Sequence, residues 1–139
     1  MIIRPFQPND LEAVVRLWND CGLVVPGNDP HKDIQRKLNV QPEMFLLGCL
    51  NEQIIASVMV GYEGHRGWIN YLAVHPDRQR SGIGKLMMEE AEELLRAAGC
   101  PKINLQIRSS NTAIIEFYNT LGFNTDDVVS LGKRLEPDN

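Results

Sequence analysis

Apolar positions at helical spacing predict four helices along the chain. Residues 11–18 carry apolar side chains three or four positions apart, after Asn9 or Asp10 as a capping residue. A shorter, more charged pattern covers 31–38. The strongest pattern covers 82–98, where glutamates lie mostly off the apolar stripe and Gly99 follows. The last predicted helix runs from Ser110 or Asn111 to Leu121.

Short, nearly continuous apolar runs predict strands between these helices. They cover 1–5, 44–50, 53–61, 68–74 and 102–107, and Phe123 with 128–135 is expected to supply one or two final strands. Turns at 51–53 and 62–67 join the second, third and fourth runs into an antiparallel meander. This order indicates a mixed α/β layer, because strands and helices do not alternate as in a doubly wound fold.

Composition narrows the class of protein. The 139 residues fit a single domain, taken as 1–139. Fourteen Lys and Arg against 18 Asp and Glu give a net charge of -4, which argues against a nucleic-acid-coating surface but permits a small anionic ligand where cations gather. The apolar runs fall short of the roughly 18 residues of a membrane span, and the first residues do not resemble a signal peptide. We therefore expect neither nucleic acid nor membrane as a partner.

Cysteine and histidine usage favours a reducing, cytoplasmic setting without a metal site. The three cysteines are widely spaced and odd in number, so they indicate neither a disulfide framework nor a zinc ribbon. The three histidines are far apart and form no HxxxH pair.

The segment from Tyr71 to Lys85 carries the clearest chemical signal. A buried strand leads through a polar loop into the long helix, and the first turn of a helix has free N–H groups and a positive dipole end that suit phosphate. Gly82 and Gly84 would let a ligand approach the backbone closely. Three cations lie within eight residues, at Arg78, Arg80 and Lys85. An exposed loop with incidental arginines is the alternative that these residues alone leave open.

Two common phosphate motifs do not fit this segment. A P-loop needs glycine where Gln79 stands and Ser or Thr where Leu86 stands. A dinucleotide fingerprint needs a third glycine where Met87 stands. The segment therefore predicts an anion cradle of a different kind.

Two motifs resemble the GCN5-related N-acetyltransferase (GNAT) superfamily. The segment 79–84, Gln-Arg-Ser-Gly-Ile-Gly, is similar to that family's Q/R-x-x-G-x-G/A motif, and the preceding 72–76 resembles its L-A-V-x-P strand end. Segment 111–123 is similar to its downstream N-x-x-A-x-x-F-Y-x-x-x-G-F signature, with a typical spacing between the motifs. The resemblance extends over the whole chain and points to small bacterial members. It implies a central mixed, mostly antiparallel sheet flanked by about four helices.

The resemblance also implies a function: transfer of the acetyl group from acetyl-CoA, as co-substrate, to a primary amine by direct attack in a ternary complex. The backbone of Leu72, Ala73 and Val74 would pair with the pantetheine arm. Asn111 would bind the pantetheine, cap its helix, or do both. The pyrophosphate would lie on the amides of the helix start, at Arg80, Ser81, Gly82, Ile83, Gly84 and Lys85.

By the same resemblance, Tyr118 would be the general acid that protonates the departing CoA thiolate. Its alternative role is that of a core aromatic. The general base is open, because Gln106 stands where some family members carry Glu. Glu63, His65, Glu116 and a water chain are the substitutes.

The acceptor side stays less defined. The loop 21–30 would flank the acceptor site and set specificity, and Trp18 is expected in the core or in the lining of that site. The acceptor is a small molecule or a peptide amine, either a protein N-terminus or a lysine. A CoA-binding sensor or interaction module without turnover is the rival function, and a homodimer is compatible with the family.

Overall fold

The computed structural model describes residues 1–138 and contains one five-stranded sheet, with the strands in chain order. The first four strands are antiparallel neighbours, and the fifth runs parallel to the fourth. The prediction of a mixed, mostly antiparallel sheet is confirmed. The strands are β1 (Ile2–Pro5), β2 (Phe45–Leu50), β3 (Gln53–Tyr62), β4 (Gly67–Val74) and β5 (Ile103–Leu105).

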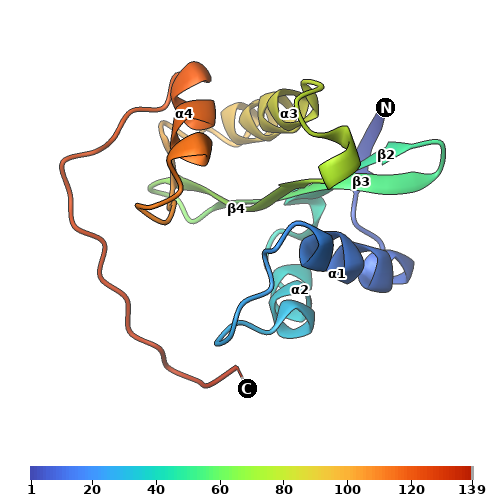
Figure 1. Ribbon diagram of the computed structural model, residues 1–139. Helices are drawn as coiled ribbons and strands as arrows, with labels where there is room; N and C mark the ends of the chain where they lie inside the picture. Colours follow the sequence, from blue (N-terminus) through green and yellow to red (C-terminus); the bar gives the residue numbers. More distant parts are fainter. Residues whose placement is uncertain (139) are drawn as a thin grey trace.

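Four α-helices cover the sheet in two layers, with α1 and α2 on one face and α3 and α4 on the other (Figure 1). Their positions agree with the predicted helices to within about two residues. They are α1 (Leu11–Asp20), α2 (Pro30–Leu38), α3 (Ile83–Ala97) and α4 (Thr112–Thr120), with single 3-10 turns at Pro8–Asp10, Pro42–Met44 and Pro76–Arg78.

Because helices cover both faces of the sheet, each central strand contributes side chains to two hydrophobic cores, one on each face. On β2, Phe45 and Leu47 pack with α1 and α2, whereas Leu46 packs with α3. Neither face of the strand needs polar side chains, which explains why β2 and β3 form continuous apolar runs. Trp18 of α1 is completely buried in the core on the α1 side.

A salt bridge ties the start of α1 to β1. Arg4 donates two hydrogen bonds to the Asp10 carboxylate, at 2.8 and 3.0 Å, and the Gln7 N–H donates a third at 2.8 Å. Asp10 stands at the N-cap position of α1, as the sequence predicts, but its side chain accepts from the preceding turn rather than from the helix.

The prediction of strands at Phe123 and 128–135 is wrong. After α4 the chain follows a long irregular path (Figure 1). Asp126 lies beside β5 and Asp138 beside α2. Strand propensity reflects fit to a pleated, half-buried surface. Here the apolar side chains have no such surface, and Val128, Val129, Leu131 and Leu135 are 77 to 90% exposed.

No helix within residues 1–138 is long and apolar enough to cross a membrane.

Candidate active site

A β-bulge in the middle of β4 shapes the site. Asn70 lies opposite Met59 and Ala73 opposite Ser57, so Tyr71 and Leu72 together face the single residue Val58. Tyr71 has a φ of 52°, in the left-handed region that L-residues seldom adopt. A bulge of this kind bends its strand and redirects its backbone groups.

A buried hydrogen-bond chain holds the bulge. The Trp18 indole N–H donates to the Ser57 hydroxyl at 2.9 Å, and that hydroxyl donates to the Tyr71 carbonyl at 2.8 Å. The Trp18 and Tyr71 rings stack with centroids 3.8 Å apart. Trp18 is therefore a core residue that also sets the conformation of the site.

Beyond the bulge, one edge of β4 is open. The ladder between β4 and β5 pairs only Gly67, Trp68 and Ile69 with Ile103–Leu105. The predicted strand at 102–107 is shorter than expected, and within residues 1–138 the last five residues of β4 have no strand on that side.

The hydrogen-bonding alternation of an antiparallel pair tells which backbone groups face this open edge. His75 N–H donates to Ile55 O at 2.8 Å, so the adjacent Val74 directs its groups away from β3. By the same alternation Leu72 also faces the open edge, whereas Ala73 turns its backbone groups to β3. Two of the three predicted β4 residues thus offer backbone groups to a ligand. The Val74 carbonyl is already occupied, since it accepts from Gln79 Nε2 at 3.0 Å and from Cys21 Sγ at 3.3 Å.

The loop after β4 leads into the first turn of α3, where backbone N–H groups have no partner within the helix. The first helical hydrogen bond runs from Leu86 N–H to Gly82 O at 3.1 Å, so the N–H groups of Ile83, Gly84 and Lys85 precede the ladder. Gly82 has a φ of 84° and Arg80 a φ of 63°, which turn the chain into the helix. This loop is exposed, and within residues 1–138 neither Arg78 nor Arg80 has an ion-pair partner.

Gly84 has a packing reason as well. A Cβ atom there would lie 3.1 Å from Cζ of Phe117, so glycine lets the start of α3 approach α4 without a shift of that ring. Gly84 therefore has a packing role beside the one expected toward a ligand. At Gly82 a Cβ would meet no atom within 4 Å, and the positive φ is the reason for glycine.

Tyr118 lies on α4 in the core between the sheet and α3, and is 7% exposed. It lines a large cleft of about 1,410 Å³ together with Asn70, Leu105 and Gln106. Burial raises the pKa of Tyr118 well above its ordinary value, so the hydroxyl is protonated at neutral pH. At the start of the same helix, the Asn111 side chain accepts from Ile114 N–H at 3.3 Å and has the predicted capping role.

A second cleft, of about 600 Å³, lies on the α1–α2 face of the bulge. Leu23 and Asn28 from the loop 21–29 line it, together with Asp33 and Arg36 of α2 and Tyr71 of β4. The Tyr71 hydroxyl donates to Asp33 Oδ2 at 2.6 Å. Burial and this hydrogen bond raise the pKa of Tyr71. The bulge residue thus stands between the open edge of β4 and this cleft.

The acetyltransferase (GNAT) family model matches residues 11–123. The chain belongs to the GNAT acetyltransferase family. An acetyltransferase of Pectobacterium atrosepticum is 49% identical over 138 residues, which cover 99% of this chain and 98% of that protein. One of Sodalis glossinidius is 46% identical over 139 residues, with 99% and 98% covered.

Solved structures share the GNAT fold. Ard1 from Thermoplasma volcanium superposes with a TM-score of 0.80 at 24% identity, covering 88% of this chain and 82% of that one. The ribosomal-protein-S18-alanine N-acetyltransferase from Escherichia coli gives 0.75 at 24% identity, covering 88% and 77%. The family resemblance and the fold class predicted from sequence are confirmed.

Two of the substitutes for a general base lie apart from the bulge of this GNAT acetyltransferase. Glu63 and His65 lie in the turn between β3 and β4. At roughly 3.3 Å per residue, about 16 Å of β4 separates this turn from the bulge. Glu63 accepts from the N–H groups of Arg66 and His65, which lower its pKa and make it a poor base. Glu116 is exposed on α4. Gln106 lines the large cleft and donates to the Ser130 hydroxyl.

Residues 1–138 contain no group of three or more His, Cys, Asp or Glu side chains arranged to hold a metal ion.

The sequence alone does not assign Ser57, Asp33 or Tyr71 to the site. Ser57 is a lone hydroxyl inside the apolar run 54–60, and a buried strand tolerates a polar group only with a hydrogen-bond partner. That signal could have marked Ser57. The pairing of Asp33 with Tyr71 joins residues 38 positions apart and becomes visible only in the fold.

Proposed function

We propose that the protein transfers the acetyl group of acetyl-CoA to a primary amine. One observation carries the proposal: the open edge of β4 leads directly into the loop that presents free amides at the start of α3. An extended amide-containing arm could pair with the first, and a pyrophosphate could bind the second. The hydrogen bond from Gln79 to the Val74 carbonyl keeps the two features together.

In this proposal each part of acetyl-CoA has its own residues. The backbone of Leu72 and the N–H of Val74 would pair with the pantetheine arm, and buried Ala73 would pack beneath it. Asn111 would contribute from the start of α4. The segment Arg80–Lys85, which also holds Ser81, Gly82, Ile83 and Gly84, would bind the pyrophosphate through its amides, with Arg80 and Lys85 adding charge.

The chemistry would be a direct attack. The amine nitrogen would add to the thioester carbonyl, and a backbone N–H at the bulge would stabilise the developing oxyanion. Collapse would break the C–S bond and release the CoA thiolate, which would take the Tyr118 proton. The attacking nitrogen would lose its proton to water, because Glu63 lies apart from the bulge and Glu116 is exposed on α4. Most of the rate enhancement would come from positioning.

We further propose that the enzyme works in the cytoplasm. Its three cysteines are free thiols, as is usual in a reducing compartment.

Cys21 is a poor nucleophile. Its thiol is half-buried, burial raises its pKa, and it donates to the Val74 carbonyl.

An amine panel tests the proposal. Thiol release from acetyl-CoA is followed with small amines, amino acids, an N-terminal peptide and a lysine-containing peptide, and products are identified by mass spectrometry. We expect release that depends on the amine and yields its acetylated form. Binding of acetyl-CoA without amine-dependent release from any member would contradict the proposal and favour a binding module.

A further inference from the structure

The C-terminal segment 124–138 is attached to the domain by polar contacts, at Asp126 and Asp138 near its ends and between them through Ser130, which accepts from Gln106, and Arg134, which donates to Asn28. Near β5, the Asp126 carboxylate accepts from Lys102 Nζ at 2.9 Å and from Asn104 Nδ2 at 2.7 Å. At the other end, Asp138 lies against α2. Between these points the apolar side chains are almost fully exposed, as described above. The position of Asp138 therefore depends on its polar contacts and not on apolar burial.

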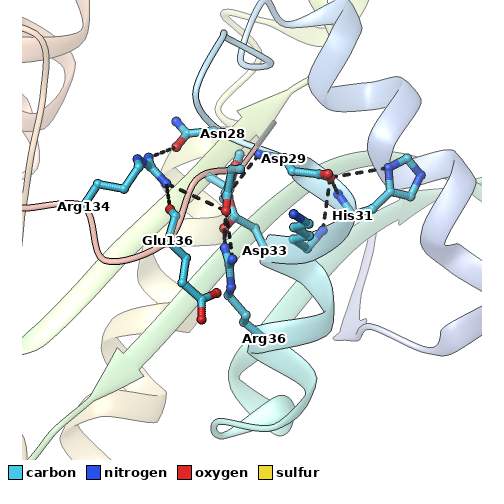
Figure 2. Close-up of polar contacts among 10 residues, drawn as sticks. Asn28, Asp29, His31, Asp33, Arg36, Arg134 and Glu136 are labelled. Carbon is cyan, nitrogen blue, oxygen red and sulfur yellow. Dashed lines mark hydrogen bonds and ion pairs between the residues drawn. The ribbon is translucent and has the colours of Figure 1, made fainter.

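Those contacts form a complete carboxylate site. Arg36 donates to both oxygens of Asp138, at 2.8 and 3.0 Å, and the Asp29 N–H donates at 3.3 Å. Figure 2 shows Arg36 reaching up from α2 and Arg134 reaching in from the C-terminal segment. The Arg134 guanidinium lies 3.8 Å from Asp138, whose side chain is only 2% exposed. A planar fork of donors around a planar carboxylate is the geometry that arginine provides best.

This carboxylate site borders the cleft beside the bulge. Arg36 also pairs with Asp33 at 3.2 Å, and Asp33 accepts from the Tyr71 hydroxyl. All three side chains line the 600 Å³ cleft, which is of a size that suits a small ligand. The cleft thus offers a cationic fork at Arg36 and, toward the bulge, the oxygens of Asp33 and Tyr71, which suit an ammonium group.

Solvent reaches the arginine side of this contact. The Arg36 side chain is 49% exposed, whereas that of Asp138 is 2% exposed, so a ligand carboxylate would have to match the bidentate contact of Asp138 in order to replace it. Such a ligand would find Arg36 and the Asp29 N–H once the C-terminal segment moved aside, and the far attachment at Asp126 would be unaffected.

We propose that Arg36 and the Asp29 N–H bind a carboxylate of the acceptor, so that the acceptor is a small amine that also carries a carboxylate. Asp138 occupies this site when the acceptor is absent. The assignment of the ligand as an acceptor rests on the proposed acetyl transfer, whereas the carboxylate site itself does not.

NMR titration of the full chain tests this proposal without turnover. The probes are ω-amino acids from glycine to 6-aminohexanoate, and the matched controls are n-alkylamines of equal carbon number. In Asp138→Asn, which removes the competing charge, we expect the Asp29 N–H and Arg36 Nε–H signals to shift with the amino acids and not with the alkylamines. The affinity should be about fivefold higher than in the wild type, because the site no longer has an internal competitor.

Two further variants decide the outcome. Asp138→Asn combined with Arg36→Gln should lose the response of the Asp29 signal. Asp126→Asn, which loosens the segment at its other end, should leave the wild-type affinity within about twofold. If Asp138→Asn does not fold, Asp138→Ser takes its place, because it also removes the competing carboxylate. Equal responses to amino acids and alkylamines, or a response that survives Arg36→Gln, would overturn the proposal.

Calorimetry with acetyl-CoA on the same samples separates the two proposals. If the Arg36 response is present but acetyl-CoA does not bind, the acetyl-transfer proposal fails and the carboxylate site stands. If acetyl-CoA binds but the Arg36 response is absent, the carboxylate-site proposal fails and the acetyl-transfer proposal stands.

Discussion

The hydroxyl of Ser57 donates a 2.8 Å hydrogen bond to the carbonyl of Tyr71, the residue whose left-handed backbone forms the bulge in β4. The same hydroxyl accepts from the Trp18 indole N–H. One oxygen atom therefore links helix α1 to the strand that directs its backbone toward the proposed acetyl-CoA site.

Ser57→Ala should destabilise the protein by about 2–3 kcal/mol, because it leaves a buried indole N–H and a partly buried carbonyl without partners. It should also lower kcat/KM, since the bulge loses its support. Urea unfolding and steady-state kinetics measure the two effects. Thr120→Ala is the matched control, because its hydroxyl makes an exposed local hydrogen bond to Phe117 O. Equal stability losses in the two variants would contradict the role given to Ser57.

Tyr118→Phe should lower kcat about 100-fold while the affinity for acetyl-CoA stays within about twofold, because only the departing thiolate needs the phenol proton. Steady-state kinetics and calorimetry separate the two quantities. Tyr62→Phe is the control, since its hydroxyl lies on the surface and donates to the carbonyls of Gly64 and Gly99 at 3.3 and 3.5 Å. Unchanged kcat in Tyr118→Phe would remove this residue from the mechanism.

The burial of Tyr118 also predicts how kcat depends on pH in the alkaline range. Because burial raises the pKa of this phenol, its proton should be retained beyond its ordinary pKa near 10. We therefore expect kcat to show no loss from Tyr118 ionisation between about pH 7 and 9.5. A fall in this range that disappears in Tyr118→Phe would contradict the raised pKa.

Gly84→Ala should cost about 1–2 kcal/mol, because the new methyl group would be only 3.1 Å from the Phe117 ring. Phe117→Leu in the same chain should recover part of that loss. Thermal unfolding of the two single variants and the double variant gives the coupling between the sites. Strict additivity would show that the close approach of α3 and α4 does not explain this glycine.

The Arg4–Asp10 salt bridge predicts an acid-dependent loss of stability. Hydrogen bonds from Arg4 lower the pKa of Asp10, so the pair stabilises the fold above the ordinary carboxyl pKa near 4 and loses this effect as pH falls through the lowered value. Asp10→Asn should cost about 1 kcal/mol at pH 7 and less near pH 3. Urea unfolding at the two pH values measures this, with exposed Asp127→Asn as the control. A cost that is equal at both pH values would contradict the assignment.

Much of this architecture could be predicted from sequence because local patterns determine it. Helix α3 carries its apolar stripe and terminal Gly99, and the segment 79–84 marks the loop before it. The bulge could not be predicted, because the two-to-one pairing of Tyr71 and Leu72 with Val58 exists only once β3 and β4 align. The path after α4 was predicted wrongly, because the apolar residues at 128–135 match a strand pattern but find no buried face.

The central claim is that the loop at the start of α3 binds the pyrophosphate of acetyl-CoA. Calorimetric titration of the wild type, Gly82→Glu and Gly99→Glu tests it most directly. Both glycines have a φ of 84° and no atom within 4 Å of an added Cβ, so the two variants carry similar backbone strain. We expect micromolar binding in the wild type and in Gly99→Glu, and a loss of at least about tenfold in Gly82→Glu, where a negative charge meets the phosphates. Equal affinity in all three proteins, or no binding to the folded wild type, would contradict the account.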